Sequence, residues 1–251
     1  MAGAALRGLL EFLLPRACAG CRVPLEPRAE DSKDLRAVDR VLCGACSRTL
    51  EFLDRAGCRL CQLPSQRLTI DGRCHRCALE DSPLDACIAA VAFEGSAESW
   101  IRDFKYPRKG IAGLLPGPES VMIALVRDAA RMLDHSRADL VVPVPLHPAR
   151  LRARGFNPAT TLARAISERT NCRLATGLLV RTRDTPTQTH LGRRRRRDNV
   201  RDAFGCTAPP AQTIWLVDDV VTTGSTLEEA ARCLRRAGAK KILGLCVART
   251  R

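Results

Sequence analysis

Two adjacent carboxylates followed by a turn rich in hydroxyl side chains stand near the C-terminus, in the sequence LVDDVVTTGST (residues 216–226). Residues 213–217 are β-branched, aromatic and apolar, which is typical of a strand buried on both faces. Residues 226–237 repeat apolar side chains at helical spacing. The turn therefore connects a strand to a helix.

This turn is suited to hold a phosphate, because backbone N–H groups at a helix N-terminus lack helical partners and the macrodipole favours an anion there. Hydroxyl groups add further donors. The residues expected around the phosphate are Thr222, Thr223, Gly224, Ser225 and Thr226.

The two carboxylates, Asp218 and Asp219, stand where open α/β sheets bind their ligands, at the carboxyl end of a strand. Carboxylates accept hydrogen bonds from sugar hydroxyls. A phosphate site and a ribose site on one turn predict a 5-phosphoribosyl ligand. The alternative is a solvated acidic turn that caps an ordinary helix.

Eight of the 13 cysteines form four CxxC pairs, which are Cys18/Cys21, Cys43/Cys46, Cys58/Cys61 and Cys74/Cys77. Two such pairs complete a closed tetrahedral zinc site, so four pairs predict two structural Zn²⁺ ions. Pairing in sequence order and interleaved pairing both remain open. A disulfide framework or an iron–sulfur cluster is the alternative to zinc, but nothing in the sequence suggests export.

Further strands are expected at residues 86–93, 139–145, 174–181 and 242–248, with helices at 98–106 and 159–169. The strand at 139–145 leads into a basic loop that carries Arg150, Arg152 and Arg154. One guanidinium group can donate two parallel hydrogen bonds to the oxygens of a phosphate, so these arginines are candidates for binding a diphosphate. An exposed basic loop without a ligand is the alternative.

A run of five arginines follows at Arg193, Arg194, Arg195, Arg196 and Arg197. It is either a solvated charge run or a track for a nucleic-acid backbone. Residues 1–86 hold 13 Lys or Arg and 12 Asp or Glu, so nearly all of the net charge of +14 belongs to the remaining chain. The arginine-rich stretch contains few aromatic side chains that could stack on bases. This favours contact with the nucleic-acid backbone over readout of the bases.

The chain divides by its composition into three parts: an amphipathic helix at 1–16, a double zinc-ribbon-like module at 17–85 and an α/β domain at 86–251. We expect the first helix to dock on the protein's own surface rather than on a membrane. No apolar stretch approaches the ~20 residues that a membrane span needs, so we expect a cytoplasmic protein that is not an integral membrane protein.

The sequence resembles the ComF (GntX-like) family. The resemblance rests on residues 216–226, on the segments 142–166 and 181–204, and on the four CxxC pairs. It implies an α/β, Rossmann-like type I phosphoribosyltransferase fold with a mostly parallel sheet, preceded by a small zinc-ribbon-like module. Pro158 is a departure, because the family usually has glutamine after Arg-Gly-Phe-Asn.

The resemblance also implies the ligand, phosphoribosyl diphosphate (PRPP) bound with Mg²⁺. Asp218 and Asp219 would contact the ribose hydroxyls, Thr222 to Thr226 the 5-phosphate, and the basic loop the diphosphate. Residues 182–204 resemble the mobile loop that covers the site in these transferases.

Three functions follow from these patterns. The first is a phosphoribosyltransferase with an unassigned acceptor. The second is a protein that handles single-stranded DNA with proteins of the competence machinery, because ComF-type proteins are implicated in DNA uptake. The third is a scaffold whose zinc module docks a partner such as a membrane channel.

Overall fold

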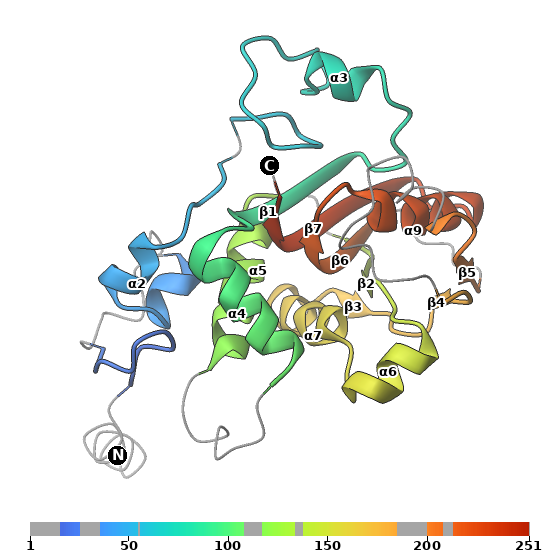
Figure 1. The fold of residues 1–251 in the computed structure, drawn as a ribbon. Coiled ribbons are helices and arrows are strands. Elements are labelled where there is room, and N and C mark those ends of the chain that lie inside the picture. Colours follow the sequence, from blue (N-terminus) through green and yellow to red (C-terminus); the bar gives the residue numbers. More distant parts are fainter. Residues whose placement is uncertain are drawn as a thin grey trace.

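The computed structural model describes residues 16–25, 36–54, 56–107, 117–133, 138–184, 200–207 and 213–250. Within these ranges a five-stranded parallel sheet has the strand order β1-β7-β6-β2-β3 (Figure 1). Its strands are β1 (Ala86–Ala92), β2 (Leu140–Pro143), β3 (Arg173–Leu174), β6 (Thr213–Val221) and β7 (Lys241–Arg249). The mostly parallel sheet confirms the predicted fold class.

Helices cover both faces of this sheet. On β6, Trp215 and Val217 pack in one hydrophobic cluster with α4 (Gly95–Lys105), α5 (Pro118–Arg131) and α7 (Pro158–Thr170). The alternate residues Ile214 and Leu216 pack in a second cluster with α9 (Ser225–Arg236). Because side chains alternate along a strand, β6 is buried on both faces, as its apolar sequence predicts.

Two segments differ from the sequence prediction. The strand expected at 174–181 is wrong as one element: β3 pairs with β2, whereas β4 (Leu179–Arg181) pairs antiparallel with β5 (Phe204–Cys206). Gly177 lies in the break, where a residue without a side chain interrupts the strand. The expected basic loop is also wrong, because residues 148–154 form α6 (Pro148–Arg154).

The cysteine-rich segments join the sheet at its β1 edge. They contain the short elements η1 (Ala37–Arg40), α2 (Gly44–Arg48) and α3 (His75–Ala78). Phe52 forms an antiparallel bridge with Val91, and the N–H of Leu53 donates to the Ala90 carbonyl at 2.9 Å. Residues shortly before Cys58 therefore pair with an edge strand that would otherwise expose free backbone groups.

Helix η1, which lies between Cys21 and Cys43, is anchored to α5 by the buried carboxylate of Asp128. This carboxylate accepts hydrogen bonds from the N–H groups of Ala37 (2.6 Å) and Val38 (3.0 Å) at the start of η1. Burial raises the pKa of Asp128, while these two N–H groups lower it. One side chain thus satisfies two backbone donors that the short helix leaves unpaired.

No described helix has the length and apolar composition needed to cross a bilayer. The amphipathic helix expected at 1–16 lies outside the described residues except for Arg16. The predicted boundary between residues 85 and 86 stays a prediction.

We expect the substitution Asp128→Ala to lower the free energy of unfolding by about 2–3 kcal/mol, because two N–H groups would lose their acceptor. Chemical denaturation measures this loss. Glu119→Ala is the control, since Glu119 is an exposed carboxylate on the same helix and should change stability by about 0.5 kcal/mol at most. Equal effects of the two substitutions would contradict the anchoring role of Asp128.

Candidate functional site

A pocket lies at the carboxyl end of β6, where the strand turns into α9. Gly224 precedes the helix with a left-handed backbone (φ 82°), a conformation that favours glycine. The first helical hydrogen bond runs from the N–H of Glu228 to the Gly224 carbonyl at 2.8 Å. The N–H groups of the preceding helical residues therefore face the pocket without a helical acceptor, as an anion site requires.

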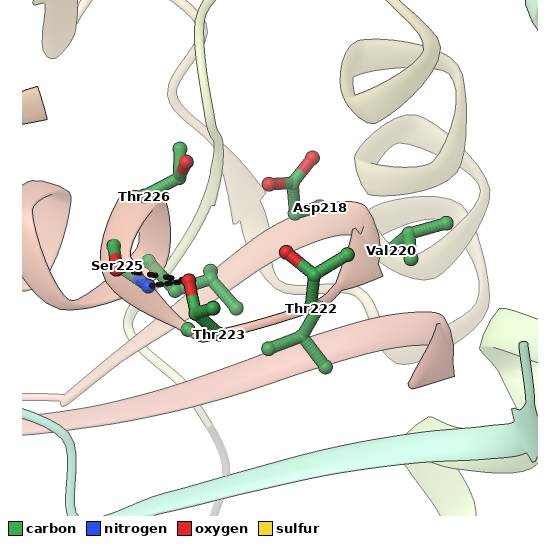
Figure 2. A pocket seen from close by; sticks show the side chains of 9 residues that line it. Asp218, Val220, Thr222, Thr223, Ser225 and Thr226 are labelled. Carbon is green, nitrogen blue, oxygen red and sulfur yellow. Dashed lines mark hydrogen bonds between the residues drawn. The ribbon is translucent and has the colours of Figure 1, made fainter. Parts of the chain in front are cut away.

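The residues around this pocket include every member of the predicted phosphate turn, Thr222, Thr223, Gly224, Ser225 and Thr226, together with Asp218. Figure 2 shows the Asp218 carboxylate and the hydroxyl groups of the turn gathered around one hollow. The hydroxyls of Thr223 and Ser225 lie 2.9 Å apart and form a hydrogen bond. The turn thus presents hydroxyl and N–H donors opposite one carboxylate.

The two carboxylates point to opposite faces of the sheet. The side chain of Asp218 lies on the same face of β6 as those of Ile214 and Leu216, and it lines the pocket together with the start of α9. The side chain of Asp219 lies on the opposite face, where its Oδ1 is 2.9 Å from the Nζ of Lys105 at the end of α4. The two adjacent aspartates therefore have different neighbours, although the sequence assigned them one shared role.

Asp218 sits in an environment that disfavours its charge. Burial, and then the like charge of Asp219, raises the pKa of Asp218 to about 7. The positive charges of Lys105 and Arg181 act in the opposite direction. A cation or a hydrogen-bond donor brought by a ligand would favour the ionised carboxylate.

Arg181, the last residue of β4, places a second positive charge close to Asp218. Its pKa is lowered by burial and by the nearby charge of Arg150, while Asp218 and Asp184 raise it. Sequence reasoning missed both Lys105 and Arg181. Each ends a regular element, but basic residues are so frequent in this chain that their positions alone did not distinguish them.

Helix α6 separates the three arginines that were expected to act together. Residues four apart share a helix face, so Arg150 and Arg154 lie on one side and the exposed Arg152 on another. Arg150 pairs with Asp184 (Nε to Oδ1, 3.2 Å). The guanidinium of Arg154 lies 4.9 Å from the ring centre of Tyr106 and donates to its hydroxyl at 3.0 Å.

The residues after α6 have structural roles. Gly155 ends the helix with a left-handed backbone (φ 85°), and Asn157 caps α7 by accepting the Ala159 N–H at 3.1 Å. The Asn157 side chain also donates to the Val144 carbonyl at 3.0 Å, which ties the turn to the end of β2. Pro158 occupies the first position of α7, where its missing N–H costs nothing.

The cysteine pairs cluster in sequence order. Cys18, Cys21, Cys43 and Cys46 form one group, and Cys58, Cys61, Cys74 and Cys77 form the other; within each group the sulfurs lie within 4.8 Å of one another. The sulfurs of Cys21 and Cys43 are 3.6 Å apart, and those of Cys61 and Cys74 are 3.8 Å apart. All 13 cysteines are free, so the disulfide alternative is wrong.

Each group contains a cysteine whose pKa is lowered, which favours its thiolate form. Burial opposes the charge of Cys18, but N–H groups of Cys21, Cys43 and Gly20 together lower its pKa to about 6. The corresponding N–H groups of Cys61, Cys74 and Leu60 lower the pKa of Cys58 to about 7. Thiolates with this N–H support are suited to bind a metal ion.

The run from Arg193 to Arg197 lies outside the described residues, so its role stays a prediction. Among the described residues, the structure brings together the phosphate turn, Asp218, Asp219, Lys105 and Arg181 at one edge of the sheet.

The chain is similar in sequence to several known proteins. Residues 151–251 match the family model described as a phosphoribosyl transferase domain. The chain is 32% identical over 211 residues to the DNA utilization protein YhgH of Escherichia coli O6:H1, which covers 83% of this chain and 90% of that protein. It is 29% identical over 242 residues to competence protein F of Haemophilus influenzae, which covers 94% of this chain and 91% of that protein.

A solved structure, glutamine phosphoribosylpyrophosphate amidotransferase from B. subtilis complexed with ADP and GMP, aligns with 57% of this chain and 30% of its own, at 20% identity and a TM-score of 0.38. The alignments to YhgH and competence protein F extend over 83% and 94% of the chain. The chain therefore belongs to the ComF family, together with YhgH and competence protein F.

Proposed function

We propose that this protein binds PRPP together with Mg²⁺ and acts as a phosphoribosyltransferase. The observation that carries the proposal is the pocket at the end of β6, where hydroxyls and helix N–H groups stand opposite Asp218. The match to the phosphoribosyl transferase domain supports the proposal independently, because the matched residues 151–251 include Asp218 and the whole turn from Thr222 to Thr226.

In the proposed complex the 5-phosphate lies in the turn from Thr222 to Thr226, and the ribose hydroxyls donate to Asp218 and Asp219. An acceptor then forms a bond to the anomeric carbon while the bond from that carbon to the diphosphate oxygen breaks. The diphosphate leaves with the electron pair, close to Arg150 and Arg181. The protein would contribute mainly by positioning the ligand and by neutralising its charge.

The carboxylates fit a divalent cation. Mg²⁺ prefers oxygen ligands and is usually held by one or two carboxylates plus phosphate oxygens of the substrate. Asp218 lines the pocket together with the turn from Thr222 to Thr226, so a carboxylate stands close to the proposed phosphate. When bound, Mg²⁺ would neutralise part of the diphosphate charge.

Zinc is proposed for both cysteine groups. A tetrahedral ion with Zn–S bonds of about 2.3 Å places its sulfurs about 3.8 Å apart. The sulfur–sulfur distances of 3.6 and 3.8 Å agree with this value. The two groups would each hold one structural ion.

A second function, binding of single-stranded DNA, is favoured by the names of the relatives, a DNA utilization protein and a competence protein. The excess of Lys and Arg after residue 86 is consistent with contact to a phosphate backbone. In this hypothesis the phosphoribosyl pocket senses a ligand or recognises a 5-phosphate end.

We expect calorimetric titration with PRPP and Mg²⁺ to show saturable binding that the double substitution Asp218→Asn with Asp219→Asn weakens at least tenfold. The amides keep the size of the side chains but remove the charges that hold ribose and cation. Asp81→Asn, at an exposed position, is the control. Unchanged affinity in the double variant would refute the site assignment, and diphosphate release with a panel of acceptors would test turnover.

The raised pKa of Asp218 predicts a stability cost in the free protein. Its pKa is about 7 in the folded state, against an ordinary value of 3.8 for an aspartate, so its ionisation destabilises the fold as pH rises through this interval. We expect Asp218→Asn to increase the free energy of unfolding at pH 8 by about 1–2 kcal/mol, a value reduced for the partial exposure of the group.

Denaturant unfolding at pH 4 and pH 8 measures this effect. The difference between Asp218→Asn and the wild type should shrink towards pH 4, where the wild-type carboxyl group is protonated in the fold. A destabilised Asn variant at pH 8 would show that the charge of Asp218 is well accommodated without a ligand.

Metal analysis of the purified protein is expected to give two zinc ions per chain. Cys18→Ser and Cys58→Ser should each reduce the content to about one, because each removes a ligand from a different group. Cys172→Ser is the control, since this buried cysteine belongs to neither group. A content of two zinc ions in both ligand variants would contradict the assignment.

A further inference from the structure

Lys105 is a charged residue of the site that the proposed roles do not yet use. It is the last residue of α4, and its side chain is 25% exposed. Its ammonium group reaches across to β6 and lies 2.9 Å from Asp219, whose side chain is 13% exposed. This partly buried ion pair joins a helix end to the carboxylate that the proposed function gives to the ligand.

The ion pair opposes the binding of any other cation to Asp219. While Lys105 contacts Asp219, the carboxylate is neutralised, and a divalent ion must compete with the ammonium group for it. Releasing that ammonium without a new partner is unfavourable in a partly buried position. A ligand that brings its own negative charge next to Lys105 removes this cost.

The local backbone allows Lys105 to change partners. Tyr106 already leaves the helical conformation (φ −133°, ψ 69°), and Pro107 follows it, so Lys105 stands at the end of the helix rather than in its interior. A lysine side chain is a compact charge on a flexible four-carbon stem. It can therefore move several ångströms while α4 stays in place.

We propose that Lys105 is an exchangeable cation of the site: it neutralises Asp219 in the free protein and transfers to the anionic diphosphate when PRPP and the divalent ion bind. The inference rests on the proposed function for the identity of the anion. It makes Lys105 a ligand-binding residue and makes metal and anion bind cooperatively, since each removes an obstacle to the other.

The test compares the wild type with Lys105→Met and Lys105→Arg in the full-length, metal-replete protein. Binding of Mn²⁺ alone is followed by electron paramagnetic resonance, because Mn²⁺ suits carboxylate oxygens and not the cysteine groups. Binding of PRPP with Mg²⁺ is followed by calorimetry. Lys241→Met is the matched control, because Lys241 begins β7 at the opposite end of the sheet, and Asp219→Asn identifies the Mn²⁺ signal of this site.

We expect Lys105→Met to bind Mn²⁺ alone about tenfold more tightly and PRPP with Mg²⁺ about tenfold more weakly. Lys105→Arg should stay near the wild type in both titrations. A substitution that merely damaged the fold would weaken both ligands, so the opposite signs are diagnostic.

Unchanged or weaker Mn²⁺ binding by a folded Lys105→Met variant would overturn the proposal. Should that variant lose its thermal transition, Lys105→Gln is judged by the same criteria. If the wild type binds no PRPP, the proposed function fails, while the Mn²⁺ titrations still decide whether Lys105 competes for Asp219.

Discussion

The site depends on the alternation of side chains along β6. This strand lies between β7 and β2 and is buried by helices on both faces. An apolar strand of this kind is covered on both faces along most of its length. It can carry a charged side chain only near its carboxyl end, beyond the covering helices. There, Asp218 and Asp219 necessarily point to opposite faces, one towards the start of α9 and the other towards the end of α4. A ligand that contacts both must therefore lie across the edge, where the two faces meet.

The same sheet explains how the cysteine-rich part is attached. Two backbone hydrogen bonds join residues 51 and 53 to β1, and the side chain of Gln62 both donates to the Ala89 carbonyl (3.1 Å) and accepts its N–H (2.6 Å). Arg249 of β7 donates to the carbonyl of Leu60 at 2.8 Å. The segment that carries Cys58 and Cys61 is thus part of the edge of the sheet, and its fold and that of the transferase domain support each other.

The sequence allowed prediction of features that depend on local pattern. The strand–turn–helix at residues 213–237, the four CxxC pairs and most strands follow from composition and periodicity over short windows. Which cysteine pairs come together, and the contact between Lys105 and Asp219, depend on residues 13 or more positions apart in the chain. The helix at Pro148–Arg154 was missed because resemblance to a basic loop outweighed the helical preference of its residues.

Helix α4 connects the first cysteine group with the proposed phosphoribosyl site. Near its middle, Trp100 packs so closely on Gly20 that an added Cβ there would lie 3.0 Å from its ring and 2.9 Å from the Cys46 sulfur. At its end, Lys105 reaches Asp219. Five residues of helix span only about 7.5 Å, so a displacement at one end is carried to the other with little loss. The position of α4, and with it the ammonium group beside Asp219, is therefore fixed in part by the packing of the cysteine group, which gives that group a structural role in the site itself.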